Sequence, residues 1–243
     1  MLRSPGSADR RSLGPGEVQV WYTLLSDLHP HLASLSGCLS PSERLRAARF
    51  RQEKDGLDFT LSHGFLRTVL GGQLGASACA ASWSVDPFGK PHPAEAGPGG
   101  DVLEFSLSRA SGAAVCALSR QDPVGIDVER LEPRPDLQAL AASVLTPRER
   151  EAFASLPANQ HERAFHLSWV CKEALLKLEG VGLGVHPRAI EVGPACWEAR
   201  TFSLLWEGQG RFVRMFEFAD HYVAALATLS EPYAVQFARF EAP

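Results

Sequence analysis

The sequence lacks several features that would assign it to a class of protein at once. No apolar run approaches the length of a membrane-spanning helix, so we expect no membrane insertion. No Gly-x-Gly-x-x-Gly or Walker-type loop is present, so neither a dinucleotide nor ATP is implied. The formal net charge of −4 argues against a nucleic-acid binder that relies on a broadly basic surface, although a local basic pocket for an anion stays open.

Cysteine and histidine are present, but without the spacing of disulfide or zinc sites. The five cysteines include no Cys-x-x-Cys pair, are odd in number and lie partly in apolar runs. None of the eight histidines belongs to a His-x-x-x-His pair or a Cys/His cluster. We therefore expect reduced, buried thiols, no zinc, and a cytoplasmic protein.

The length allows one substantial core or two small ones. Of the 243 residues, 45% are hydrophobic and 21% are charged, which is ordinary for a globular protein. Residues 1–16 are rich in Arg, Ser, Gly and Pro and lack the apolar stretch of a signal peptide. They are interpreted as a disordered leader.

Pairs of segments repeat at a nearly constant distance along the chain. Ser40 and Thr146, 106 positions apart, each precede a proline and are followed three residues later by a glutamate, the pattern of a capping box at a helix start. The same offset aligns Phe59–Ser62 with Phe165–Ser168, and a third pair of strand-like segments lies at a slightly larger offset. Together these echoes favour a duplication.

The chain is therefore expected to form two similar α/β halves, residues 17–119 and residues 120–243. Alternating apolar residues in the last third favour antiparallel hairpins, and the whole pattern predicts an α+β fold. Helices are expected at about Pro41–Arg51, Phe59–Leu70, Pro147–Ser155 and Glu162–Leu178. Strands are expected at Trp83–Val85, Leu103–Leu107, Ala113–Leu118, Val124–Val128, Ile190–Val192, Thr201–Trp206, Phe212–Phe218 and Tyr222–Leu229.

Two short motifs carry most of the chemistry. In the strand-like segment Val124–Glu129, side chains alternate between faces, so Asp127 and Glu129 project from the same side. In the helical segment Ser168–Lys177, i, i+4 spacing puts Glu173 on one face with the lysine that ends the segment. Three carboxylates that converge would repel one another unless a hard divalent cation lay between them, and oxygen ligands suit Mg²⁺ used with a phosphate-bearing substrate.

The pairing of Gly-Ile-Asp-Val-Glu with Trp-Val-Cys-Lys-Glu-Ala-Leu-Leu-Lys resembles the two signature motifs of the 4′-phosphopantetheinyl transferases. The two-half organisation and the Gly-Lys-Pro turn after Phe88 resemble the Sfp-type branch of that family. The resemblance implies a pseudo-twofold arrangement of the halves, with the active site at their interface. It also implies an Mg²⁺-dependent enzyme that moves the phosphopantetheine arm of coenzyme A to a serine of an acyl, peptidyl or aryl carrier protein, releasing 3′,5′-adenosine bisphosphate. Because both halves lie in one chain, the groove between them needs no partner subunit, and we expect a monomer.

By this resemblance, Asp127, Glu129 and Glu173 bind the metal. The alternative for an Asp-x-Glu pattern is a solvated charge pair. Glu173 is also a candidate general base for the serine hydroxyl, but a metal-bound carboxylate is a poor base, so the ligand role ranks above it. Lys177 is placed to neutralise or protonate the leaving phosphate; the alternative is a surface Glu–Lys pair of roughly 0.2–0.5 kcal/mol.

Further residues are implied as contacts to coenzyme A, Asp127 and Lys177 among them. One or both of Arg46 and Arg49 would meet the 3′-phosphate, although an exposed basic face explains any single arginine about equally well. Arg109 stands where the family usually has a histidine, and it keeps a positive charge there that does not depend on pH. The remaining implied contacts are Gly89, Lys90, Pro91 and Ser108.

Two other functions stay open at this point. A catalytically silent module that binds coenzyme A or a carrier protein would not need the intact acidic residues and lysine of the two motifs. A metal-dependent phosphohydrolase would usually need further carboxylates or histidines for a second metal.

Overall fold

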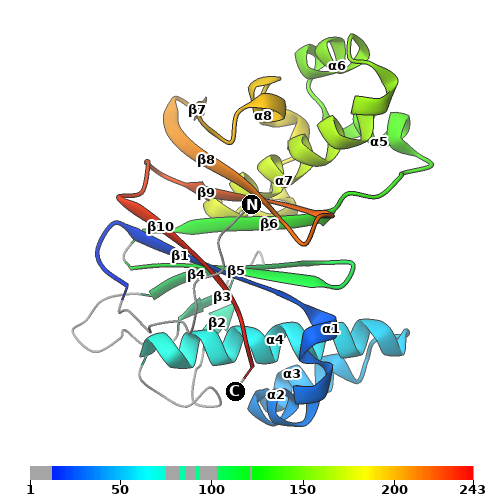
Figure 1. Ribbon diagram of the computed structural model, residues 1–243. Coiled ribbons are helices and arrows are strands. Elements are labelled where there is room, and N and C mark those ends of the chain that lie inside the picture. Colours follow the sequence, from blue (N-terminus) through cyan, green and yellow to red (C-terminus); the bar gives the residue numbers. More distant parts are fainter. Residues whose placement is uncertain (1–12, 75–82, 86–90, 94–102, 121, 243) are drawn as a thin grey trace.

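The computed structural model describes residues 13–74, 83–85, 91–93, 103–120 and 122–242, and these residues form an α+β fold (Figure 1). Its strands are β1 (Glu17–Leu24), β2 (Trp83–Val85), β3 (Pro91–Pro93), β4 (Leu103–Ala110), β5 (Ala113–Arg120), β6 (Val124–Arg130), β7 (Thr201–Trp206), β8 (Gln209–Phe218), β9 (Tyr222–Thr228) and β10 (Ala234–Arg239). Its α-helices are α1 (Leu25–Leu28), α2 (Leu32–Cys38), α3 (Pro41–Ala47), α4 (Glu53–Leu74), α5 (Leu137–Val144), α6 (Pro147–Ala154), α7 (His161–Glu179) and α8 (Ala195–Glu198). Short 3₁₀ turns are η1 (His29–His31), η3 (Ala158–Gln160), η4 (Gly182–Gly184) and η5 (Pro187–Ala189).

Two four-stranded sheets pack face to face and form the centre of the molecule. The first has the order β10-β1-β5-β4 and the second the order β6-β9-β8-β7; β2 and β3 pair separately. Apolar residues from both sheets meet between them, among them Val20 and Val115 from the first and Ile126 and Leu226 from the second. One set of alternating apolar residues from each sheet therefore forms a shared layer between the sheets, and the opposite faces bury further clusters against the helices.

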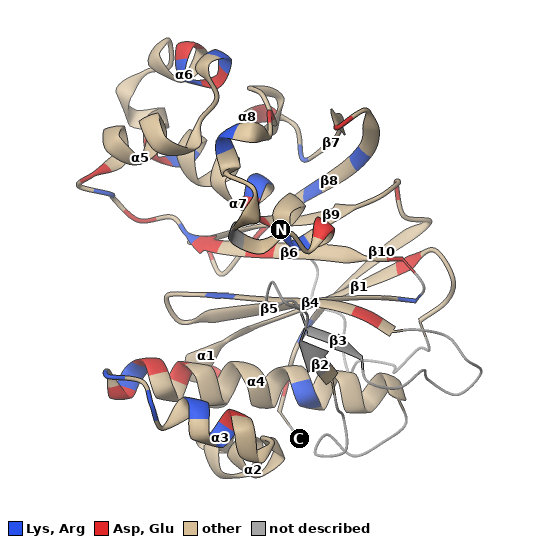
Figure 2. Cartoon of the chain, turned by 180° about the vertical axis from the view of Figure 1, so that it is seen from behind, with Lys and Arg blue, Asp and Glu red and all other residues tan. Residues whose placement is uncertain are grey.

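One long helix covers the outer face of each sheet (Figures 1 and 2). Helix α4 packs on the first sheet through Leu61 and Phe65, and α7 packs on the second through Val170 and Leu175. The layer order is helix, sheet, sheet, helix, which confirms the predicted α+β fold of two similar halves.

The two predicted helix starts are both capping boxes. In α3, Ser40 Oγ accepts from the backbone N–H of Glu43 while the Glu43 carboxylate accepts from the backbone N–H of Ser40. Thr146 and Glu149 make the same reciprocal pair at the start of α6. The echo in the sequence thus corresponds to the same local structure in each half.

Several predicted elements differ from the structure. Residues Ile190–Val192 are not a strand, because the backbone N–H groups of Val192 and Gly193 donate to the buried carboxylate of Glu149 instead of to a neighbouring strand. Helices α1, α2, α5 and α8, none longer than eight residues, and strands β1 and β10 were not predicted. The strand β10, assigned to the second half, pairs in parallel with β1 of the first sheet.

The last residues of the predicted leader belong to the fold. Residues 1–12 lie outside the described residues, but Leu13 is buried and its carbonyl accepts a hydrogen bond of 2.8 Å from Arg120. Within the part of the chain that the structure describes, no helix is both long and apolar enough to span a membrane. Cys116, Cys171 and Cys196 are buried free thiols, as the sequence predicted, and burial raises the pKa of Cys116.

Candidate active site

A cleft of about 700 Å³ lies between the two halves. One wall comes from α4 and β4, with His63 and Phe105 among its side chains, and the other comes from α5, α7 and the segment that follows α7. Trp169, Glu173 and Lys177 line the α7 wall, as their i, i+4, i+8 spacing on one helix face predicted. The cleft therefore lies at the interface where the sequence placed the site.

Gly125 sets the distance between the two motifs. A Cβ atom at this position would lie 2.0 Å from the backbone O of Ala174 and 2.4 Å from the backbone N of Leu178. Only glycine lets α7 approach β6 this closely. Two residues further along the strand, on the same face, Asp127 comes within reach of side chains from α7.

Asp127, Ser108 and Lys177 form a closed triangle of hydrogen bonds. Lys177 Nζ donates to Asp127 Oδ1 at 2.7 Å and to Ser108 Oγ at 2.8 Å, and Ser108 Oγ donates to Asp127 Oδ1 at 2.7 Å. The other oxygen, Asp127 Oδ2, is buried and has no hydrogen-bond partner in the structure. These hydrogen bonds join β4, β6 and α7 through one residue of each, and they leave Asp127 Oδ2 as an acceptor without a donor.

Glu129 lies next to Asp127 on the strand and is largely buried. Its Oε1 accepts a 3.0 Å hydrogen bond from Trp169 Nε1, and its Oε2 lies 3.8 Å from the guanidinium of Arg134. Burial and the charge of Asp127 raise the pKa of Glu129 to about 7, although Trp169, Arg134 and Lys177 oppose the shift. The site thus holds negative charge that its own cations do not fully balance.

Glu173 contributes a third carboxylate from α7. Burial first, and then the charge of Asp127, raise its pKa, while Lys177 lowers it. Because the charge of Asp127 acts on both Glu129 and Glu173, the three predicted ligands share one electrostatic environment.

The donor chemistry of this environment fits a hard divalent cation. Carboxylate oxygens are the ligands that Mg²⁺ prefers, and Asp127 Oδ2 is a buried oxygen that lacks a partner. A cation would also relieve the repulsion that raises the pKa of Glu129 and Glu173. As the side chains stand, however, no group of three His, Cys, Asp or Glu residues among those described is gathered closely enough to hold an ion.

A pair of arginines lies at the other end of the cleft's first wall. The guanidinium of Arg46 lies 5.3 Å and that of Arg109 lies 5.5 Å from the ring centroid of Phe59, and Arg109 also lies 5.6 Å from that of Phe50. Neither arginine has a carboxylate within ion-pair distance among the described residues. Burial first, and then the neighbouring charge of Arg46, lower the pKa of Arg109, while the charges of Asp58 and Asp55 oppose the shift.

Not every predicted contact residue reaches the cleft. Arg46 lines it, whereas Arg49 does not, although both side chains are exposed. Glu173 and Lys177 also line the cleft, but these predicted residues do not: Ser108, Arg109, Asp127 and Glu129. Gly89 and Lys90 lie outside the described residues, and Pro91 begins β3, where it pairs with Val85.

Two features of the site were missed from the sequence. Lys172, beside Glu173 in the motif, is fully buried and ion-paired at 2.6 Å with Glu149 of the second capping box. His63, which the sequence suggested was only packed or solvated, lines the cleft and bonds to Glu43 of the first capping box. The capping boxes themselves were the available signal, because each glutamate makes a further contact to the long helix of its half.

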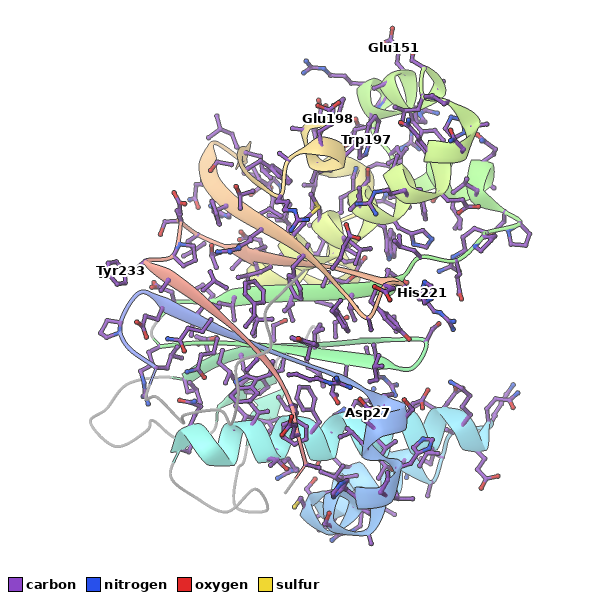
Figure 3. The ribbon with its side chains drawn as sticks, viewed as in Figure 1. Asp27, Glu151, Trp197, Glu198, His221 and Tyr233 are labelled. Carbon is purple, nitrogen blue, oxygen red and sulfur yellow. The ribbon has the colours of Figure 1, made fainter. Side chains whose placement is uncertain are left out.

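A second cavity of about 370 Å³ lies where α1 and the start of α4 meet the β8–β9 turn, near His221. Figure 3 shows His221 and Asp27 on the same side of the molecule. None of the predicted site residues lines this cavity.

Comparison with known proteins agrees with this geometry. The family model of the 4′-phosphopantetheinyl transferase superfamily matches residues 123–227, the segment that contains both motifs. The 4′-phosphopantetheinyl transferase HetI of Nostoc is 37% identical over 171 residues, covering 69% of this chain and 70% of HetI.

More distant relatives support the same family. A putative 4′-phosphopantetheinyl transferase of Synechocystis is 26% identical over 167 residues, covering 69% of this chain and 66% of that protein. The transferase Sfp of Bacillus subtilis is 25% identical over 147 residues, covering 60% of this chain and 62% of Sfp.

The fold and the cleft are those of a two-lobed transferase whose site combines clustered carboxylates with basic groups. The chain belongs to the 4′-phosphopantetheinyl transferase superfamily, as the two motifs predicted.

Proposed function

We propose that this protein transfers the 4′-phosphopantetheine arm of coenzyme A to a serine of an acyl, peptidyl or aryl carrier protein, and that the reaction requires Mg²⁺. The observation that carries the proposal is the contact of Ser108, Asp127 and Lys177 at the interface of the halves, flanked by Glu129 and Glu173. The cleft, about 700 Å³, falls in the range of roughly 300–1,000 Å³ typical of sites for small molecules and cofactors.

In the proposed reaction the carrier serine oxygen bonds to the β-phosphorus of coenzyme A, and its hydroxyl proton is released to solvent water or, if Glu173 acts as base, to that carboxylate. The bond from that phosphorus to the bridging oxygen breaks, and 3′,5′-adenosine bisphosphate leaves with the electron pair. Lys177, whose ammonium already lies at the carboxylate cluster, stabilises or protonates the leaving phosphate. Ser108, which belongs to the first half, hydrogen-bonds to both Asp127 and Lys177 and so fixes their positions relative to each other.

Asp127, Glu129 and Glu173 would hold the Mg²⁺. When bound, the ion supplies positive charge to the pyrophosphate oxygens as negative charge develops on them. Trp169 and Arg134 orient Glu129 through the contacts described above. We propose Asp127 as the central ligand, because its Oδ2 is the buried oxygen without a partner.

Glu173 has two candidate roles that one variant separates. If Glu173 is a metal ligand, Glu173→Gln weakens the affinity of the site for Mg²⁺, so a higher Mg²⁺ concentration should restore part of the activity. If Glu173 is the general base, Glu173→Gln lacks the proton acceptor for the serine hydroxyl, and added Mg²⁺ restores no activity. We place the ligand role first, so we expect partial restoration.

Contacts to coenzyme A are proposed from the first half. Arg46 lines the cleft and Arg109 lies against the same Phe59 ring, and both would bind the 3′-phosphate, which guanidinium groups bind in bidentate geometry. Gly89, Lys90 and Pro91 stay candidates from the resemblance alone. Arg49 is the weaker candidate because it lies beyond the end of α3 and does not line the cleft.

The test is incubation with an apo carrier protein, coenzyme A and Mg²⁺, followed by the mass of the carrier. Addition of the arm supports the proposal, and chelation of the metal should abolish it. An unchanged carrier would instead indicate a silent binding module, and cleavage of coenzyme A without carrier modification would indicate a hydrolase. Asp127→Asn should be inactive, whereas Glu217→Gln, which removes only the exposed pair with Arg163, should retain activity.

We further propose a monomeric, cytoplasmic enzyme. Both walls of the cleft come from one chain, so no partner subunit is needed to complete it. The buried free thiols Cys116, Cys171 and Cys196 suit a reducing compartment. Light scattering that returned an obligate oligomer would contradict the first of these two statements.

A further inference from the structure

His63 presents a hydrogen-bond acceptor to the cleft. It lies on α4, lines the cleft, and its Nδ1 lies 2.9 Å from Glu43 Oε1. Burial alone would raise the pKa of Glu43, but hydrogen bonds from His63, the backbone of Ser40 and Arg67 lower it to about 2. Glu43 is therefore an ionised acceptor, which requires that Nδ1 of His63 carry the proton.

The remaining ring nitrogen of His63 is left with a lone pair. Burial and the charges of Arg109 and Arg46 lower the pKa of His63 and outweigh the opposing contact with Glu43, so the ring is neutral near pH 7. In a neutral ring with the proton on Nδ1, Nε2 accepts hydrogen bonds. It bonds to no side chain or backbone group within the described part of the chain.

The ring plane of His63 is fixed by its neighbours. It stacks on Phe59 with a centroid distance of 3.9 Å and an interplanar angle of 24°. Arg46 and Arg109 lie against the same Phe59 ring, at 5.3 Å and 5.5 Å from its centroid. A held acceptor therefore stands beside two cations that make no ion pair within the described part of the chain, although Asp58 and Asp55 lie near enough to act on the charge of Arg109.

Two guanidinium groups beside a neutral acceptor nitrogen suit a ligand in which one carbon carries an anionic group and the neighbouring carbon carries a hydrogen-bond donor. Two guanidinium groups attract a phosphate, whereas a neutral acceptor nitrogen attracts an O–H or N–H group. In coenzyme A the ribose hydroxyl at C2′ is the donor next to the 3′-phosphate. An acceptor that a bound ligand covers discriminates against ligands that lack the matching donor, because it then stays unpaired.

We propose that His63 Nε2 accepts a hydrogen bond from the ribose 2′-hydroxyl of coenzyme A, so that this histidine makes the enzyme selective for the ribonucleotide next to the 3′-phosphate. The inference rests on the proposed transferase activity and on the placement of the 3′-phosphate at Arg46 and Arg109. Glu43 and Phe59 act through His63: the first fixes its tautomer and the second its ring plane.

The experiment compares coenzyme A with 2′-deoxycoenzyme A as co-substrate for transfer to an apo carrier. In the unmodified enzyme we expect 2′-deoxycoenzyme A to have a Michaelis constant roughly three- to tenfold higher, the effect of losing one neutral hydrogen bond. In His63→Phe, which keeps the stacking on Phe59, the difference between the two co-substrates should disappear. His63→Gln, whose amide oxygen can serve as acceptor, should keep part of it.

A matched control is available in the second half. His161 stacks on Phe153 with a centroid distance of 4.4 Å and an interplanar angle of 23°, but it does not line the cleft. His161→Phe should keep the selectivity of the unmodified enzyme, and thermal melting should show that all variants are folded.

The outcomes separate this inference from the proposed function. An enzyme that transfers no arm even from coenzyme A contradicts the transferase activity itself. Efficient transfer with equal Michaelis constants for the two co-substrates overturns only the role of His63. A second comparison, of coenzyme A with 3′-dephosphocoenzyme A, tests whether His63 contacts the phosphate instead. The proposed role is also overturned if His63→Phe loses selectivity for the 3′-phosphate but keeps the selectivity of the unmodified enzyme for the 2′-hydroxyl.

Discussion

The buried ion pair between Lys172 and Glu149 allows a quantitative test of how the cleft is held together. Both side chains have no exposed surface. Lys172 Nζ donates to Glu149 Oε2 at 2.6 Å and to the carbonyls of Ile190, Val144 and Pro187 at 2.8, 3.1 and 3.3 Å. These carbonyls belong to the segments that flank α7 on the cleft side.

The change Lys172→Met removes the cation but keeps most of the volume of the side chain. It leaves a fully buried carboxylate without its ion-pair partner and removes the ammonium donor from three carbonyls, of which that of Pro187 still accepts from the backbone N–H of Ile190. Breaking a buried pair in this way costs about 3–5 kcal/mol. The backbone N–H groups of Thr146, Val192 and Gly193 still donate to Glu149, so we expect the lower part of that range.

Urea unfolding of the purified protein measures this free energy, and the same loss should lower the melting temperature by roughly 10 °C for a chain of this size. Lys54→Met is the matched control, because Lys54 makes an exposed i, i+4 pair with Asp58 and should change stability by about 0.5 kcal/mol or less. If Lys172→Met unfolds within 1 kcal/mol of the unmodified protein, on the order of the uncertainty of such measurements, then the pair does not hold these segments and the reasoning is wrong.

Three further predictions concern other parts of the fold and site. Gly125→Ala should destabilise the protein by about 3 kcal/mol and reduce transfer, because its Cβ would push α7 away from β6; chemical denaturation and a transfer assay that both matched the unmodified protein would contradict this. The folded protein lowers the pKa of Glu43 from 4.5 to about 2, so the ionised carboxylate contributes about 3 kcal/mol of stability above pH 4.5. This contribution is lost as the pH falls through 2. In acid denaturation, the difference in free energy of unfolding between Glu43→Gln and the unmodified protein should therefore shrink between pH 4.5 and pH 2. Arg109→Ala should raise the Michaelis constant for coenzyme A roughly tenfold or more, and Arg109→His should do so mainly as the pH rises above about 6.5; unchanged constants in both variants would discard this contact.

The sequence was most informative where a local pattern has one structural solution. Two residues apart on a strand, Asp127 and Glu129 could be assigned to one face, and Glu173 and Lys177 to one face of a helix. The capping boxes at Ser40 and Thr146 could be assigned for the same reason, since each is closed within four residues.

Features that depend on long-range contacts could not be predicted. Nothing near Lys172 distinguishes a buried lysine from an exposed one, because its four acceptors come from residues at least 15 positions away. The irregular path of Ile190–Val192 depends on the carboxylate of Glu149, which supplies the acceptor that a neighbouring strand would otherwise supply. The role of His63 in the cleft likewise depends on Glu43, 20 positions earlier.

The parallel pairing of β10 with β1 has a consequence for how the protein can be divided. Val235 lies opposite Val18 and Arg239 opposite Tyr22, so the last strand closes the edge of a sheet that began more than two hundred residues earlier. A fragment ending at residue 120 would leave the β1 edge uncovered and open to association with other strands. The two lobes are therefore not separable modules, and any fusion or affinity handle attached after Arg239 would emerge beside the lobe built from the beginning of the chain.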